Sequence, residues 1–433
     1  MTLVLSKPYT AGSFKWHERF VRNILFLACF LLVWLTATPF PDLGDPRLLE
    51  PVGQGNPLGQ IATLLLTATL SAFVLATTPR VALRAITPAL SLTLCWFAVT
   101  AMLSAYPEMA LRRFVLALLT IANATALLLL PQGREHFSRL LAVGAIVILA
   151  ICYIGVLLLP QFSIHQSTDV IENSLAGAWR GPFGHKNSAG ASMVVLIFIG
   201  IFVMRSGNRI AGCVIIAGAS LFLPFTMSKS PIGFLPLAVA LAFVVLRLRH
   251  AAARWALVVG SLVIINLLTV GTVAIEPMRN MLGGLMPDSS FTGRDEIWRF
   301  ALERVLEKPV TGFGYQAFWG TADLVLNWNP QESWGLRASD AHNGYLNIAV
   351  MTGLVGLALS LIWLVAQPLT DLVALKRRNL DSTLTLLFTQ IWIFGLCLSG
   401  VESVLFSGGD SLWFMMIVSI TGLRLQKVAE LCR

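Results

Sequence analysis

Apolar runs long enough to cross a membrane recur along most of the chain. A transmembrane helix needs about 20 mostly apolar residues, and twelve segments come close to that requirement. They lie at about 24–40, 58–77, 85–104, 114–131, 140–159, 188–204, 210–226, 231–246, 255–275, 343–366, 382–401 and 410–423. The pattern predicts an all-α polytopic membrane protein with about twelve transmembrane helices, in which residues 1–433 form a single membrane domain.

Lysine and arginine gather in the N-terminal segment and then in every second connection between these runs. Basic residues accumulate in short loops on the cytoplasmic side of a membrane. They are Lys7, Lys15, Arg19, Arg22, Arg80, Arg84, Arg134, Arg139, Arg205, Arg209, Arg247, Arg249, Arg254, Lys376, Arg377, Arg378, Arg424, Lys427 and Arg433. The alternation agrees with twelve spans and predicts that both termini are cytoplasmic.

Two segments expected on the opposite, extracytoplasmic side are long. Residues 161–187 precede the sixth span, and residues 276–341 are far longer than a connection requires. Within the second segment, residues 295–308 carry apolar side chains at helical spacing and are followed by Pro309, which predicts an amphipathic helix. We expect the segment 276–341 to fold against the membrane.

Composition and charge support this topology. Hydrophobic residues make up 56% and charged residues 12% of the chain, at a mean hydropathy of +0.76, whereas soluble domains carry roughly 25% charged residues. The net charge is +9, but 19 of the 31 basic residues fall on the predicted cytoplasmic side with only five acids. The other side carries 12 basic and 17 acidic residues. The basicity is therefore a topology signal, and no nucleic-acid partner is expected.

Four residues able to bind or titrate near phosphate fall at the outer ends of predicted spans: Arg180, Lys229, Arg294 and His342. Arginine suits forked phosphate recognition, lysine acts as a point charge, and histidine is a base near neutral pH. Each also has an ordinary explanation. A lone cation at a helix end is usually an interfacial anchor, and a lone outer histidine is usually a surface or capping residue.

Other kinds of chemistry find less support in the sequence. No charged residue falls at mid-depth in a predicted span, where an ion-coupled transporter often carries one. No HExxH or DxD sequence occurs among the outer residues, so a metal-dependent transferase is disfavoured and no metal or cofactor is expected.

One motif indicates a family. His342-Asn343, followed after nine residues by Gly353 and then by Gly356, resembles the motif of the O-antigen ligase and polymerase superfamily. Three stretches are more similar still to its exopolysaccharide polymerase branch of the succinoglycan type: Arg180–Gly190, Thr292–Trp298 and Gly312–Trp319. The resemblance covers about residues 90–425. One departure is Lys229, at a position that often holds arginine in the superfamily, so that its phosphate contact would be single and not forked.

The resemblance implies a glycosyltransferase C-like membrane fold and a periplasmic active face at the inner membrane of a bacterium. It implies transfer of a glycan from undecaprenyl diphosphate to a sugar hydroxyl without a metal or another cofactor, with lipid-linked oligosaccharides as donor and acceptor. Flippase and chain-length or export proteins are possible partners. His342 would be the base or position the acceptor, and Arg180 and Arg294 would hold the diphosphate. Contacts to diphosphate or sugar would come from Lys229, His185, Asn343 and Tyr315.

Several functions share this set of motifs. The favoured one is polymerisation of lipid-linked repeat units into exopolysaccharide or O-antigen, with 276–341 as the catalytic segment. The alternatives are a ligase that moves glycan onto lipid A-core, a transferase that glycosylates protein, and a flippase or exporter of lipid-linked glycan. A flippase should show a cationic cavity within its spans, whereas this chain keeps its cations at one face.

Overall fold

The computed structural model describes residues 12–49, 57–278, 280, 293–326, 338–377 and 382–429. Within these ranges the chain is nearly all helical, with a single isolated β-bridge between Ile164 and Trp179. The main helices are α1 (Gly12–Leu35), α2 (Pro57–Thr77), α3 (Pro79–Ala85), α4 (Pro88–Met102), α5 (Pro107–Leu129), α6 (Arg134–Leu158), α7 (Pro160–Ser163), α8 (Lys186–Arg205), α9 (Arg209–Phe225), α10 (Lys229–Arg247), α11 (Ala251–Leu268), α12 (Gly271–Ala274), α14 (Arg294–Glu307), α15 (Ala322–Leu326), α16 (Gly344–Leu361), α17 (Gln367–Arg377), α18 (Ser382–Leu398) and α19 (Ser411–Ala429).

Proline marks where several of these helices begin. Pro79, Pro88, Pro107 and Pro160 each stand in the first positions of a helix, where the missing N–H is harmless and the fixed φ angle suits the first turn. Between α3 and α4 the chain bends by 70°. Thr87 caps the second helix there by accepting a hydrogen bond from the Leu90 N–H. The residues that carry Arg80 and Arg84, predicted as a connection, form a helix of their own.

Each of the twelve predicted spans overlaps a helix of the structure, but fewer helices satisfy a test of length and apolarity. Among the described residues, seven segments are long and apolar enough to cross a membrane: α2, α5, α6, α8, α10, α11 and residues 344–375. The bent pair α3–α4 would make an eighth, while α9 and α18 are apolar but shorter. The structure therefore indicates a multi-pass membrane protein, and the count of twelve remains a prediction.

Burial distinguishes the centre of the bundle from its periphery. The apolar window of α8 is 78% buried, whereas those of α2 and α11 are 17% buried. Nearly all side chains of α18 are buried as well. Outer helices expose large apolar side chains such as Leu65 and Leu157, which are suited to contact lipid.

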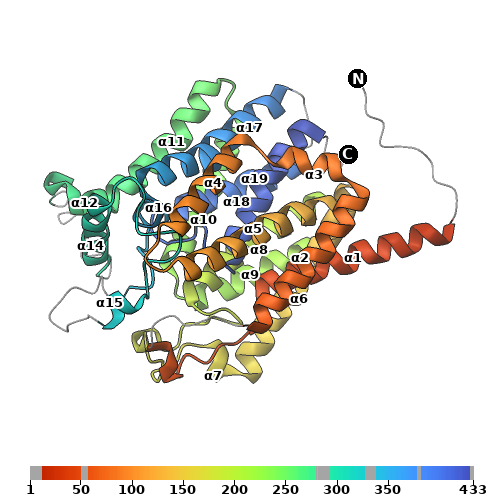
Figure 1. Cartoon of the computed structure of the whole chain (residues 1–433). Helices are drawn as coiled ribbons and strands as arrows, with labels where there is room; N and C mark the ends of the chain where they lie inside the picture. Colours follow the sequence, from red (N-terminus) through yellow and green to blue (C-terminus); the bar gives the residue numbers. More distant parts are fainter. Residues whose placement is uncertain are drawn as a thin grey trace.

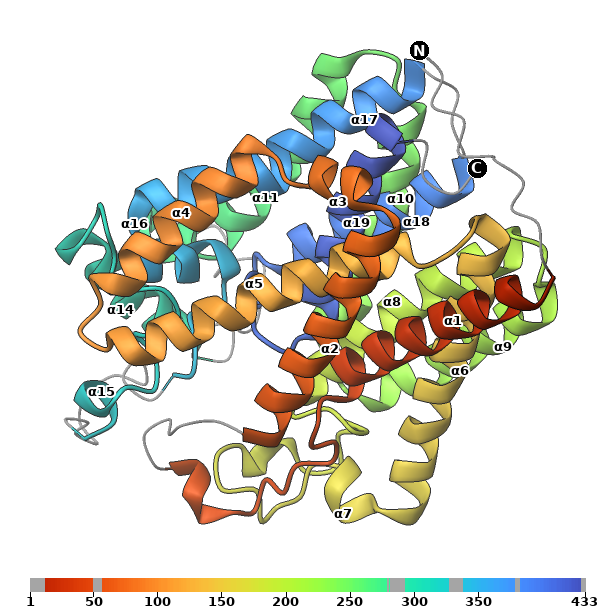
Figure 2. The same cartoon turned by 45° about the vertical axis from the view of Figure 1, so that its right-hand side comes forward.

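The bundle has two opposite ends that carry different helices (Figures 1 and 2). The helices α14 and α15 and the start of α16 lie at one end, and the short helix α3 and the end of α19 lie away from them in both views. The amphipathic helix predicted at 295–308 is present as α14. Thr292, expected to begin it, lies outside the described residues.

Candidate active site

A carboxylate stands at the centre of a polar cluster at the end of the bundle that carries α14. Glu402 follows α18, and its side chain is 12% exposed. Its Oε1 accepts hydrogen bonds from Arg294 Nη2 and from Asn187 Nδ2, each at 2.8 Å. Burial raises the pKa of Glu402, but the cation of Arg294 and the hydrogen-bonding and charge of His342 lower it by more, to about 2. Glu402 is therefore ionised at neutral pH.

Arg294 is brought to this carboxylate by α14, of which it is the first residue. Gly293 precedes the helix with φ +84°, a left-handed conformation that glycine adopts readily. The apolar face of α14 includes Trp298 and Ala301, which are fully buried in a cluster with Val350 of α16. A second guanidinium nitrogen, Nη1, donates to the Val401 carbonyl. Both ends of the fork are thus used on the turn that carries Glu402.

His342 lies beside the same carboxylate. Its Nδ1 is 3.6 Å from Glu402 Oε2 and 3.8 Å from Asp340 Oδ1, and its side chain is 25% exposed. The residue has φ +45°, and its N–H donates to Asp340 Oδ1 at 2.7 Å. Burial lowers the pKa of His342, but the Asp340 and Glu402 carboxylates raise it by more, so the net shift is upward. The imidazole thus faces two carboxylates through one ring nitrogen.

The Asn343 and glycine positions of the motif are explained by packing. Asn343 is fully buried and caps α16, since its Oδ1 accepts from the N–H groups of Tyr345 and Leu346. Its Nδ2 donates to Asn266 Oδ1 and to the Gly400 carbonyl. This side chain therefore holds the start of α16 against α11 and against the turn before Glu402, and fixes His342 next to that turn.

Gly353 breaks α16 at the point where residues 309–313, which follow α14, pack against it. Its φ is +71°, and a Cβ there would lie 1.9 Å from the Val310 carbonyl oxygen. On either side of the break, Phe313 N–H donates to the Val350 carbonyl and Leu354 N–H donates to the Pro309 carbonyl. The stretch after α14 thus pairs by its backbone with the broken helix, which fixes the distance between Arg294 and His342.

The first turn of α8 and the segment before it contribute a third group of residues. Asn187 Nδ2 binds Glu402, and its Oδ1 accepts a hydrogen bond from Ser228 Oγ at 2.7 Å. His185 Nε2 is 2.8 Å from Glu172 Oε2, and this histidine also caps α8. Burial lowers the pKa of Lys186 most, the charges of Lys229 and Arg294 lower it further, and the carboxylates of Glu172 and Glu402 oppose the shift. Lys186 therefore sits within the charge cluster.

The structure brings together only some of the residues predicted from sequence. Arg294 and His342 meet at Glu402, and Lys186 Nζ donates to the Met227 carbonyl at 3.4 Å, two residues before Lys229 at the start of α10. Arg180 is 1% exposed and donates to the Phe183 and Pro41 carbonyls at 3.0 and 2.7 Å. Burial lowers the pKa of Arg180, and its charged neighbours are Asp169 and Asp42 and not Glu402.

Tyr315 also lies away from the cluster. It is 1% exposed, and its ring packs between Phe97 and Phe406, with centroids 4.9 and 6.5 Å away. In this conformation Tyr315, Asn343 and Arg180 position the chain and do not face an open site. Among the described residues no group of three His, Cys, Asp or Glu side chains is placed to hold a metal ion.

Sequence reasoning missed the residue at the centre. Glu402 follows an apolar run without any motif around it, in Ser399-Gly400-Val401-Glu402. The available signal was its rarity, because it is an acid next to a predicted span on the face that carries the cations. Asn187 and Lys186 stand inside the stretch Arg180–Gly190 that the sequence singles out; Lys186 is one of its cations, but the sequence predicts no role for Asn187.

Comparison with known proteins tests the resemblance directly. Residues 211–361 match the O-antigen ligase family. The chain is also 26% identical over 219 residues to the exopolysaccharide production protein ExoQ of Rhizobium meliloti (strain 1021). That alignment covers 48% of this chain and 50% of the relative, so the chain spans about half the length of the curated protein it matches. The resemblance seen in the motifs is confirmed.

The matched segment includes only part of the cluster. Lys229, Arg294, His342 and Gly353 lie within residues 211–361, whereas Asn187 and Glu402 lie outside it. The family-matched segment therefore supplies Arg294 and His342. The flanking parts of the chain supply Glu402, which lies between these two side chains, and Asn187, which binds Glu402.

Proposed function

We propose that this protein is a membrane glycosyltransferase that joins oligosaccharide repeat units carried on undecaprenyl diphosphate into exopolysaccharide or O-antigen. The observation that carries the proposal is the placement of Glu402 between Arg294 and His342, at 2.8 and 3.6 Å. The match to the O-antigen ligase family and the similarity to an exopolysaccharide production protein support it. The reaction takes place at the periplasmic face of the inner membrane.

His342 serves as the base for the acceptor sugar. With Nδ1 toward the carboxylate of Glu402, the proton is favoured on Nδ1, and Nε2 is left to accept the proton of an acceptor hydroxyl. The hydroxyl oxygen then attacks the anomeric carbon of the donor. The bond from that carbon to the diphosphate oxygen breaks, and the polyprenyl diphosphate leaves with the electron pair.

Cations beside the carboxylate receive the diphosphate. Lys186 and Lys229 lie close enough to influence each other, and Arg294 acts on the same lysine. Fixed positive charges that face the developing charge of a leaving group lower the barrier more than they stabilise the bound substrate. We assign the diphosphate contacts to Lys186, Lys229 and Arg294. Arg180 is assigned the task of holding the turn before α8, because it is 1% exposed and bound by backbone carbonyls, whereas the Arg294 side chain is 20% exposed.

His185 remains a candidate for substrate contact. Its side chain is 30% exposed and is held by Glu172 at the rim of the same segment. Asn343 and Tyr315 are buried and act through the helices they fix. No metal or other cofactor has a role in this scheme.

The same site would serve a ligase that transfers finished glycan to lipid A-core, and this is the second candidate because the matched family is described as O-antigen ligase. Deletion of the gene followed by analysis of lipid-linked glycans distinguishes the functions. A polymerase mutant accumulates single repeat units on the lipid, a ligase mutant accumulates long lipid-linked chains, and a flippase mutant traps units that face the cytoplasm. Only the first result agrees with the proposal.

Replacement of the base tests the site in the same cells. His342→Ala should abolish polymer while the protein still inserts and accumulates, because the side chain is partly exposed and caps no helix. His250→Ala is the matched control, since His250 is exposed and precedes α11 without a capping side-chain bond. Polymer of normal chain length in His342→Ala would refute the assignment of the base.

A further inference from the structure

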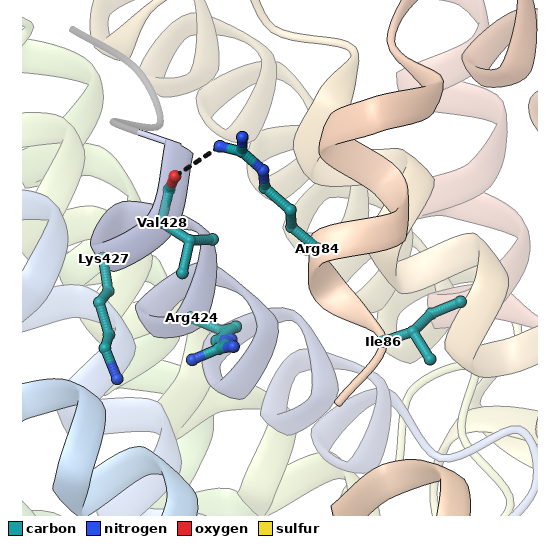
Figure 3. Close-up of a pocket in the computed structure, with 5 residues that line it drawn as sticks. All are labelled: Arg84, Ile86, Arg424, Lys427 and Val428. Carbon is teal, nitrogen blue, oxygen red and sulfur yellow. Dashed lines mark hydrogen bonds between the residues drawn. The ribbon is translucent and has the colours of Figure 1, made fainter. Parts of the chain in front are cut away.

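A second polar site lies at the opposite end of α19 from Glu402. It is a pocket of about 420 Å³ between the α3–α4 turn and the end of α19, within the range of roughly 300–1,000 Å³ typical of small-ligand sites. Its walls are Arg84, Ile86, Arg424, Lys427 and Val428 (Figure 3). We propose that this pocket binds the phosphate group of an anionic membrane phospholipid.

The charge of the pocket favours an anion. Arg424 Nη1 and Lys427 Nζ both bind Oδ1 of Asp371 on α17, at 3.3 and 2.6 Å. Asp371 is 1% exposed, so its charge is directed at these two cations. Among the described residues Arg84 has no carboxylate within 4 Å. Among the described residues, the pocket brings together three cations and one carboxylate.

The walls are held in place by polar contacts. Arg84 reaches from α3 to the end of α19, where its Nη1 donates to the Val428 carbonyl at 2.7 Å (Figure 3). Thr87 Oγ1, in the turn after α3, donates to Gln367 Oε1 of α17 at 2.6 Å. The carbonyl at the end of α19 is thus already paired with a guanidinium, and three helices meet at a preformed cationic site.

The surroundings suit a lipid better than a soluble anion. Ile86 is 58% exposed and Leu83, one residue before Arg84, is 63% exposed. Apolar side chains directly beside the cations give acyl chains a surface next to the place where the phosphate binds. The charge pattern of the sequence places this end of the bundle at the cytoplasmic membrane surface, and basic pockets between helices on that side are suited to bind lipid head groups.

The test uses the purified full-length protein and native mass spectrometry with added phosphatidylglycerol, phosphatidylcholine or inorganic phosphate. The wild-type protein should retain phosphatidylglycerol in preference to phosphatidylcholine. A hydrogen bond from a pocket cation to the bound phosphate contributes at least about 1 kcal/mol, equivalent to about fivefold in affinity, beyond the general attraction of surface cations for anionic membranes. Arg84→Gln and Arg424→Gln should therefore each weaken phosphatidylglycerol binding by about fivefold, and the double variant by about 25-fold.

Two further variants sharpen the test. Arg80→Gln is the matched control, since Arg80 is an exposed cation on α3 that does not line the pocket, and it should leave the affinity unchanged. Asp371→Asn removes a negative charge from the pocket and should strengthen phosphatidylglycerol binding. Elution of this variant at the wild-type volume in size-exclusion chromatography checks that it is folded. Equal binding of both lipids, or equal losses in Arg80→Gln and Arg84→Gln, would overturn the proposal. Retention of inorganic phosphate in place of the lipid would overturn the lipid assignment.

Discussion

Replacing Glu402 with glutamine tests whether this carboxylate orients and charges His342. The amide keeps the size of the side chain but removes its charge. It can also present an N–H to His342 Nδ1, which favours the tautomer with the proton on Nε2 and so blocks the nitrogen proposed as the base. Arg294 would then face His342 without the carboxylate between them, so the pKa of His342 should fall.

The size of the effect follows from the distance. At 3.6 Å between Nδ1 and Oε2, the Coulomb attraction between imidazolium and carboxylate is about 1 kcal/mol with the dielectric constant of water and about 5 kcal/mol at an effective value near 20. That energy stabilises the imidazolium formed when the acceptor proton is taken. Its loss slows the reaction by about tenfold to a few thousandfold, and we expect a fall of about 10²–10³ for this partly buried pair.

The assay is polymerisation of lipid-linked repeat units by the purified protein between pH 5 and 9, with products resolved as a ladder. The rate should rise with pH through the raised pKa of His342, because the neutral imidazole is the base. Asp340→Asn is the matched control, since Asp340 also faces Nδ1, at 3.8 Å, and raises the same pKa. Both variants should shift the rising limb to lower pH and lower the plateau rate, because each loses a charge near Nδ1. The loss should be larger in Glu402→Gln, because in Asp340→Asn the side-chain oxygen still accepts the His342 N–H and presents no N–H to Nδ1 from that position.

The outcome can refute the reasoning in two ways. A full plateau rate in Glu402→Gln would show that the carboxylate does not orient the base. If the rising part of the pH–rate profile were unchanged in both variants, the titrating group would not be His342, whatever the loss of rate.

Four other results are expected. In Arg294→Lys, the single ammonium group cannot bind both the Val401 carbonyl and the Glu402 carboxylate. Activity should therefore fall about tenfold to a hundredfold at unchanged expression. Arg180→Lys should lower the free energy of unfolding by about 1–3 kcal/mol and leave KM unchanged, whereas a diphosphate clamp would show a raised KM and normal stability. Gly353→Ala should destabilise by at least about 1–3 kcal/mol in thermal unfolding, and Gly260→Ala, where a Cβ meets nothing within 4 Å, should not. Because the pKa of Glu402 is lowered from 4.5 to about 2, its stabilising contribution is present above pH 4.5 and lost toward pH 2, so wild-type and Glu402→Gln melting temperatures should converge in acid.

Much of the fold follows from local sequence signals. Apolar length located the helices, whereas the prolines at 79, 88 and 107, which stand at helix starts in the structure, were not used to place the predicted starts. The helix α3 and the bend after it were not predicted, because Arg80 and Arg84 mark those residues as a connection, and charge alone does not show where a helix forms or bends. The same limit applies to Gly353, whose φ of +71° depends on a distant segment that docks on α16.

The candidate site, like the fold, was predicted from the sequence only in part. Arg294 and His342 were identified by residue chemistry and motif, and both contact one carboxylate in the structure. Arg180 has the same chemistry and a motif of its own, yet it is buried on backbone carbonyls. Burial depends on tertiary packing, which one sequence does not reveal. Glu402 escaped notice for the converse reason, since only the fold shows which cations surround it.

The late position of Glu402 in the chain has a consequence for biogenesis. Arg294 and His342 leave the ribosome before α18 and α19 are made, and Glu402 lies between those last two helices. A nascent chain that has inserted only as far as α17 therefore carries the imidazole and the guanidinium without the carboxylate that orients one and neutralises the other. Under the proposed function, catalytic competence would arise only when α18 and α19 have inserted, so that incomplete chains would not act on lipid-linked sugars.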